Sequence, residues 1–218
     1  MSIENKKTVE IYEEKAATYL KTTIEHDKLD EEKAKRKKEK LQNFIKENLE
    51  QFKKGSKVFE IGSADGENAK YIKELGYNVT ASDIADAFIN ETKSKIENTI
   101  KFNVLEDDFK DKYSAVFAWR VFVHFTKEDL DITLNKVYKA LENGGVFIFN
   151  IMNRETRDCD EEWVDFPNEY HMNAERYYKY FSEKEVNELI QKTNFKIKSF
   201  HKEGGESKNK WLVYVLKK

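Results

Sequence analysis

The fold of this chain is decided by one stretch of sequence, VFEIGSADGENAKYIKELGYNVTASD, at residues 58–83. It begins with a short apolar run of β type at 58–61 and continues through small residues into a helical segment at 68–75. A second β run at 78–82 leads directly into Asp83. Strand, glycine turn, helix and strand in this order are typical of a parallel α/β sheet that binds a nucleoside-type cofactor at the carboxyl ends of its strands.

The alternation of β runs and helical segments continues downstream. Thr126 and Ser182 each open a helix with a capping box, and Asn143-Gly144-Gly145 is expected to end the first of these helices just after Leu141. Two final β runs joined through Gly204-Gly205 predict a hairpin. Strands are expected near residues 100–104, 114–119, 146–149, 195–200 and 211–216, and one more helix near 86–96.

The segment before this alternation is rich in charge and is expected to be helical. Its apolar residues recur with helical spacing, and Gly55 is placed to stop the helix. These apolar residues are Leu41, Phe44, Ile45, Leu49 and Phe52. With 218 residues and 39% hydrophobic composition, the chain is long enough for one substantial core and too short for two full domains.

Composition excludes several classes of protein. Lysine and arginine number 39 against 41 acids, and the two signs interleave, so the charge indicates a solvated surface and disfavours a nucleic-acid partner. Cys159 is the only cysteine, which rules out an internal disulfide. The four histidines lack the spacing of metal ligands, so no metal is expected. The polar start and the short apolar runs predict neither a signal peptide nor a membrane span, and we expect a cytoplasmic protein.

The loop at residues 60–66 carries the first chemical signal, because its small residues let backbone amides approach a ligand. A dinucleotide fingerprint would need glycine at the position of Glu67, and a phosphate loop would need a Gly-Lys-Ser or Gly-Lys-Thr that the chain lacks. Asp83 is placed to accept hydrogen bonds from ribose hydroxyls. These residues disfavour a nucleotide-dependent oxidoreductase. They favour a protein that binds a nucleoside-type cofactor.

Glu60-x-Gly62-x-Ala64-x-Gly66 followed by Asp83 resembles the class I S-adenosylmethionine-dependent methyltransferase family. The resemblance covers most of the chain. It implies a Rossmann-like, seven-stranded, mostly parallel α/β sheet with an antiparallel last strand and helices on both faces. It also implies S-adenosyl-L-methionine as the cofactor. The domains expected are lid or packing helices at 1–54 and a methyltransferase domain at 55–218, with an insert on the substrate side at about 153–180.

The same resemblance implies the cofactor residues. Ala64 stands where the family usually has its middle glycine, and Asn103 stands where an aspartate commonly meets the adenine amino group, with Asp107 or Asp108 as alternatives. Tyr12 and Tyr19, with Ala16 between them, resemble a lid helix. The full set expected to bind the cofactor is Tyr12, Tyr19, Glu60, Gly62, Ser63, Ala64, Gly66, Asp83, Ile84, Asn103, Val104 and Trp119.

The acceptor should lie beside the residues that follow the fourth and fifth strands, which include Asn153. His124 is our candidate general base, since imidazole titrates near neutral pH, and a histidine that only packs at a helix start is the alternative. Arg120 is a candidate for holding an anion. The insert contributes further candidates for a pocket wall, namely Arg157, Trp163, Phe166, Tyr170, Arg176 and Tyr177. The substrate residues that we select are Arg120, His124, Arg154, His171 and Tyr178.

These observations favour a methyltransferase acting on an oxygen or nitrogen of a small polar metabolite, such as a sugar derivative or a phosphorylated metabolite. A tRNA-modifying methyltransferase is the nearest alternative, and the clustered basic residues at 33–38 are the only stretch that favours it. A non-catalytic protein that binds a nucleoside cofactor is the alternative from another class.

Overall fold

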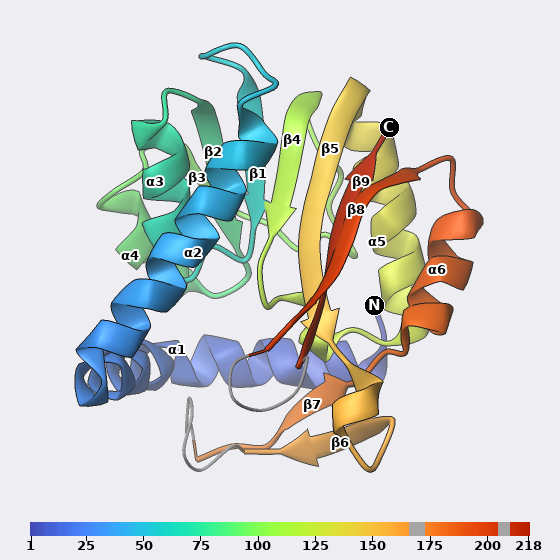
Figure 1. Ribbon diagram of the computed structural model, residues 1–218. Helices are drawn as coiled ribbons and strands as arrows, with labels where there is room; N and C mark the ends of the chain where they lie inside the picture. Colours follow the sequence, from blue (N-terminus) through green and yellow to red (C-terminus); the bar gives the residue numbers. More distant parts are fainter. Residues whose placement is uncertain (166–172, 205–209) are drawn as a thin grey trace.

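A seven-stranded sheet forms the centre of the chain in the computed structural model, which describes residues 1–165, 173–204 and 210–218 (Figure 1). The strand order is β3-β2-β1-β4-β5-β9-β8, and β9 alone runs opposite to the other six strands of this sheet. This confirms the predicted fold class. The strands of this sheet are β1 (Lys57–Ile61), β2 (Asn78–Asp83), β3 (Thr99–Lys101), β4 (Tyr113–Ala118), β5 (Leu141–Met152), β8 (Lys196–Glu203) and β9 (Trp211–Lys217).

Helices cover both faces of the sheet because the central strands are apolar on both sides. β4, for example, is buried at every position. On one face, Phe147 and Phe149 pack with Leu134 of α5 and Leu189 of α6. On the other face, α2 and α3 cover a second apolar cluster. The helices are α1 (Ile3–Leu29), α2 (Glu31–Leu49), α3 (Glu67–Glu74), α4 (Asp86–Lys93), α5 (Lys127–Ala140) and α6 (Glu183–Gln191).

The long helix α1 crosses the edge of the sheet at which the parallel strands end (Figure 1). At its start, the Ser2 hydroxyl donates to the buried carboxylate of Asp129 at 2.6 Å. Further along, Glu13 pairs with Lys101 of β3 and accepts a hydrogen bond from the backbone nitrogen of Asp86 at 3.1 Å. The helix is therefore fastened to the body of the protein at both sides of the sheet edge.

The insert after β5 contains a short 3-10 turn, η2 (Arg154–Thr156), and an antiparallel pair, β6 (Glu161–Val164) and β7 (Arg176–Lys179). β7 packs against α1 and against η1 (Phe122–His124), the 3-10 turn after β4. The insert therefore lies below the same edge of the sheet (Figure 1).

Both predicted capping boxes are present, at Thr126 and Ser182. The predicted end of the first capped helix is wrong, because α5 stops at Ala140 and β5 begins at once with Leu141, whose backbone is extended and pairs with Tyr113. Gly144, at a φ angle of +82°, lies in the irregular start of that strand rather than after a helix. Three other predicted boundaries differ by a few residues. The helix expected at 86–96 ends at Lys93, and the strand expected at 100–104 covers Thr99–Lys101. The strand expected at 195–200 covers Lys196–Glu203.

Candidate active site

Gly62 and Gly66 give the loop after β1 a conformation that suits glycine, with φ angles of +70° and +75°. A Cβ atom at Gly62 would lie 2.4 Å from Cγ2 of Val121, and one at Gly66 would lie 3.0 Å from Cγ2 of Thr92. Ala64 has a φ angle of +45°, in a region that costs a residue with a side chain about 1–2 kcal/mol. The loop is therefore both tightly packed and strained at its centre.

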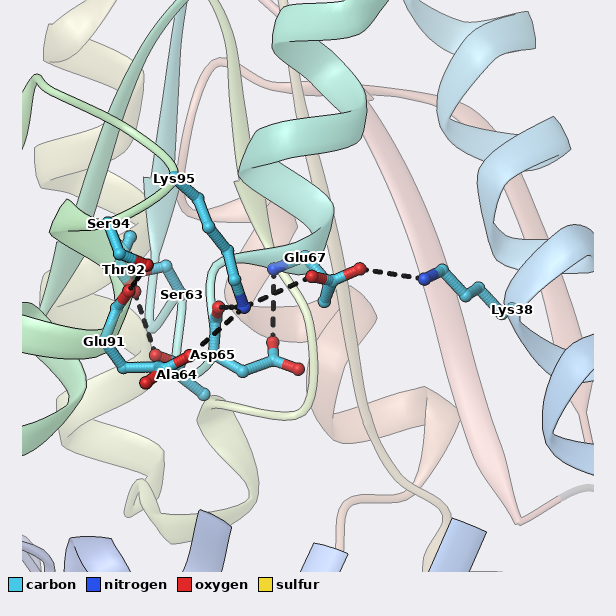
Figure 2. Close-up of polar contacts among 9 residues, drawn as sticks. All are labelled: Lys38, Ser63, Ala64, Asp65, Glu67, Glu91, Thr92, Ser94 and Lys95. Carbon is cyan, nitrogen blue, oxygen red and sulfur yellow. Dashed lines mark hydrogen bonds and ion pairs between the residues drawn. The ribbon is translucent and has the colours of Figure 1, made fainter. Parts of the chain in front are cut away.

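Neighbouring helices hold this loop from outside (Figure 2). From α4, Thr92 donates its hydroxyl proton to the carbonyl oxygen of Ala64 at 2.9 Å, and Lys95 just beyond α4 donates to the next carbonyl oxygen at 2.6 Å. Lys95 also pairs with Glu67 at 3.2 Å, and Lys38 of α2 pairs with Glu67 at 2.8 Å. These contacts fix the position of the loop.

Asp83 ends β2 beside the loop, and its side chain is buried. One carboxylate oxygen accepts a hydrogen bond from the backbone nitrogen of Ala64 at 2.9 Å, and the other accepts bonds from Ile84 at 2.8 Å and Ala85 at 3.3 Å. Burial raises the pKa of Asp83 to about 6, although these three bonds favour the charged form. A carboxylate offers about four acceptor positions, so one remains for a ligand hydroxyl.

Glu60 lies near the end of β1 with its side chain 1% exposed. Burial, and then the negative charges of Asp65 and Asp83, raise the pKa of Glu60 to about 8. Its Oε2 atom has no hydrogen-bond partner among the residues that the structure describes. A buried carboxyl oxygen of this kind, next to the loop after β1, suits the amino group of a ligand, whose positive charge favours the carboxylate form.

The third strand end, where an adenine contact was expected, is less open. Asn103 accepts a hydrogen bond from the backbone nitrogen of Leu105 at 3.0 Å, and its own backbone nitrogen donates to Asp107 at 2.8 Å. Asp108 is exposed and pairs with Lys136 of α5 at 3.5 Å. Asn103 and Asp107 thus bond within the turn after β3, whereas Asp108 turns towards α5, and the residue that contacts a base stays a prediction.

The remaining residues expected on the cofactor side lie at strand ends, in the loop or on α1. Ser63 and Val104 are buried, Ile84 is half-buried, and the half-buried Trp119 stacks on Phe117 with ring centres 5.8 Å apart. On α1, Tyr12 and Tyr19 pack in one apolar cluster with Ala16, Ala64 and Phe88. The structure therefore brings the predicted lid helix into contact with the glycine loop.

His124 is buried in η1, and both of its ring nitrogens have partners. Nδ1 lies 2.7 Å from the carbonyl oxygen of Tyr177 and must donate to it, so Nε2 accepts from the hydroxyl of Tyr12 at 3.0 Å. Burial, and to a smaller degree the positive charge of Arg176, lower the pKa of His124 to about 3. The imidazole is therefore neutral across the physiological range.

Arg176 and Tyr178 of β7 complete this group. Arg176 is 1% exposed, its Nη1 donates to the Tyr12 hydroxyl oxygen at 3.1 Å, and its guanidinium carbon lies 5.5 Å from the ring centre of Tyr178. The rings of Tyr178 and His124 are 4.7 Å apart, and burial raises the pKa of Tyr178. We refer to Tyr12, His124, Arg176 and Tyr178 as the buried polar cluster.

Comparison with known proteins places these features in a family. A family model described as a methyltransferase domain matches residues 33–199, which is more than half of the chain. This chain belongs to the methyltransferase-domain family. Membership confirms the resemblance to methyltransferases that was drawn from the loop after β1.

Individual relatives of this methyltransferase are distant. It is 29% identical over 96 residues to a probable S-adenosylmethionine-dependent methyltransferase, TehB, of Haemophilus influenzae, which covers 41% of this chain and 33% of TehB. The chain thus spans about a third of that relative. A methyltransferase from Methanosarcina mazei has a similar fold, with a TM-score of 0.66, 15% identity and coverage of 80% of this chain and 96% of that one. The glycopeptide N-methyltransferase MtfA, solved with S-adenosylhomocysteine, gives a TM-score of 0.61 at 12% identity, with coverage of 80% and 86%.

The residues of this methyltransferase fit its cofactor at three points. Asp83 keeps an acceptor position for a ribose hydroxyl, Glu60 offers a buried oxygen for an amino group, and the loop through Gly62 brings the backbone close. The described residues contain no cluster of metal-ligating side chains and no helix long and apolar enough to cross a membrane.

The predicted substrate residues are not all brought together. His124 and Tyr178 share the buried polar cluster, whereas Arg120 is exposed at the end of β4, where its guanidinium lies 5.3 Å from the ring centre of Trp211. Arg154 is held by an ion pair with Asp160. His171 lies outside the described residues.

Arg176 is the residue whose importance the sequence understated. It was expected only as one of several residues in a pocket wall formed by the insert. Its contact with Tyr12 joins positions that are 164 residues apart in the chain. No local pattern encodes such a pair.

Proposed function

We propose that this methyltransferase transfers the methyl group of S-adenosylmethionine to an oxygen or nitrogen of a small polar metabolite. The observation that carries the proposal is the buried polar cluster beneath α1. Tyr12 packs against the same apolar cluster as Ala64 of the loop after β1, and its hydroxyl contacts His124 and Arg176. Polar atoms enclosed between a helix and the insert suit an acceptor that is small enough to be enclosed with them.

The basic stretch at the start of α2 does not favour tRNA as the acceptor. Arg36 pairs with Glu32 at 3.7 Å, Lys35 pairs with Glu39 at 4.0 Å, and Lys38 pairs with Glu67 of the glycine loop region. Much of the positive charge of this stretch is therefore balanced by neighbouring acids. A groove that binds tRNA needs positive charge that phosphates can reach.

In the proposed reaction, S-adenosylmethionine supplies an electrophilic methyl group when it is bound. The glycine loop and Asp83 hold and orient it, α1 excludes water, and the insert places the acceptor. His124 is neutral and accepts a hydrogen bond from Tyr12, so it orients the tyrosine hydroxyl. Whether His124 also removes a proton from the acceptor stays a prediction, and its low pKa suits an acceptor that needs little help to lose that proton.

Calorimetric titration tests the first part of this proposal. The purified chain is titrated with S-adenosylmethionine, with S-adenosylhomocysteine and, as a control, with NADH. Micromolar binding of the first two alone supports the proposal, and binding of NADH alone contradicts it. Binding without transfer to a panel of small amines, alcohols and phosphorylated sugars would favour the alternative of a non-catalytic cofactor-binding protein.

A further inference from the structure

The start of α4 is capped by a residue of another helix. Ala85 occupies the N-cap position of α4, where its methyl side chain is unable to accept a hydrogen bond. The backbone nitrogen of Asp86 donates instead to Oε2 of Glu13 in α1 at 3.1 Å. The N–H groups in the first turn of a helix lack partners within that helix, so a carboxylate from outside both accepts this bond and complements the positive end of the helix dipole.

The second oxygen of Glu13 contacts the end of β3. Oε1 pairs with the ammonium group of Lys101, which also lies 3.1 Å from Oδ1 of Asp86. Glu13 and Asp86 are 73 positions apart in the chain, so this carboxylate joins α1, α4 and β3. Because the side chain of Lys101 is 53% exposed, its ion pair contributes little to stability by itself, and the bond to α4 is the more informative contact.

Apolar packing places Glu13 at this position. Phe88, in the first turn of α4, is buried between two tyrosines of α1, with ring centres 6.0 Å from Tyr12 and 5.6 Å from Tyr19. Ala16, one turn after Tyr12, is buried in the same cluster. The docking of α1 therefore brings the Glu13 carboxylate to the start of α4.

The two ends of α4 adjoin the parts of the site that are expected to bind the cofactor. Asp83 lies three residues before the helix and accepts hydrogen bonds from the backbone there. At the other end, Thr92 donates to the carbonyl oxygen of Ala64 at 2.9 Å, and Lys95 donates to that of Asp65 at 2.6 Å (Figure 2). α4 has only eight residues, fewer than an isolated helix needs to be stable in water, so its order depends on such contacts from outside.

We propose that Glu13 is a positioning residue for the cofactor: by capping α4 from the lid helix, it fixes the helix that holds Asp83 and the glycine loop in place. The inference rests on the proposed function and adds a residue to its cofactor side. Glu13 acts through α4 and not by touching the reacting atoms. If only a fraction of the molecules has α4 in order, the apparent Kd for the cofactor rises in inverse proportion to that fraction.

The test compares Glu13→Ala with Glu14→Ala by calorimetric titration of S-adenosylhomocysteine. Glu14 is the matched control, because it is the next residue of α1, is 71% exposed and pairs with Lys15 of the same helix. The Kd should rise at least about threefold in Glu13→Ala, a factor in the lower part of the range for a helix cap. It should stay within about twofold of wild type in Glu14→Ala.

Lys101→Met separates the cap from the ion pair. It removes the cation beside Glu13 but leaves the carboxylate at the start of α4. An exposed ion pair contributes little, so the Kd should stay within about twofold of wild type. A loss as large as that of Glu13→Ala would assign the effect to the contact with β3 and overturn the capping role.

Hydrogen exchange, measured by mass spectrometry without ligand, separates positioning of α4 from a general loss of stability. In Glu13→Ala the amides of α4 should exchange at least about threefold faster than in wild type, while those of α5 should exchange at the wild-type rate. Unchanged exchange in α4, or faster exchange in both helices, contradicts the inference.

The titration of wild type comes first, because it tests the proposed function separately. If wild type does not bind S-adenosylhomocysteine, the proposed function itself fails. If wild type binds and the Kd of Glu13→Ala rises less than threefold, the cofactor assignment stands and the role of Glu13 is refuted.

Discussion

Gly62→Ala tests the geometry of the glycine loop. The added Cβ would lie 2.4 Å from Cγ2 of Val121, and the φ angle at this position is +70°. The left-handed backbone costs alanine about 1–2 kcal/mol, and overpacking adds about 1–3 kcal/mol. We therefore expect the free energy of unfolding to fall by about 2–5 kcal/mol, and the melting temperature to fall by about 4–20 °C for a chain of this size.

Val121→Ala separates the two contributions, because it removes the methyl group that the new Cβ would meet. In the double variant the overpacking should disappear while the backbone cost remains, which gives a favourable coupling energy of about 1–3 kcal/mol. Urea unfolding of wild type, both single variants and the double variant measures this coupling energy. Calorimetry measures how each substitution in the loop changes the affinity for S-adenosylhomocysteine. Strictly additive effects, or an undiminished stability of Gly62→Ala, would refute the reasoning.

Three further predictions concern ionisable groups of the site. Asp83→Asn should weaken S-adenosylhomocysteine binding by about tenfold or more, because an amide replaces a charged acceptor of hydrogen bonds. If calorimetry shows full affinity in this variant, Asp83 does not bind the ribose. The folded chain binds the proton of Glu60 more tightly than the unfolded chain, because the pKa rises from 4.5 to about 8 on folding. Stability should therefore fall as pH rises through this window, by up to about 1.4 kcal/mol per pH unit, and Glu60→Gln should flatten the slope in urea unfolding at several pH values. His124→Ala should lower turnover more than S-adenosylhomocysteine affinity if His124 acts on the acceptor, and unchanged turnover in an assay of S-adenosylhomocysteine release would leave it a packing role.

Local patterns predicted the parts of the fold that depend on local interactions. The capping boxes at Thr126 and Ser182 satisfy backbone amides within one turn, so the helix starts were readable from a few neighbouring residues. The end of α5 was not readable from neighbouring residues, because Leu141 is extended and pairs with Tyr113 on another strand. Sheet pairing overrode the helical periodicity at that residue.

The site shows the same division. Gly62, Gly66 and Asp83 were identified because the chain turn and the strand end that position them are written in adjacent residues. The link between Tyr12 and His124 joins residues 112 positions apart, and only the placement of α1 over the sheet edge creates it. The pKa of His124 also depends on that burial, so the sequence suggested a titrating imidazole where the structure has a neutral one.

The position of β9 has a consequence for the order in which the chain folds during synthesis. β8 precedes β9 in sequence, yet its neighbour in the sheet is β9, which lies between it and β5. When the nascent chain has emerged only as far as β8, that strand lacks its partner. Its partner in the sheet is β9, which has not yet been synthesised. The sheet up to β5 is able to assemble early, while β8 must wait with its backbone groups bonded to water until residues 211–217 leave the ribosome.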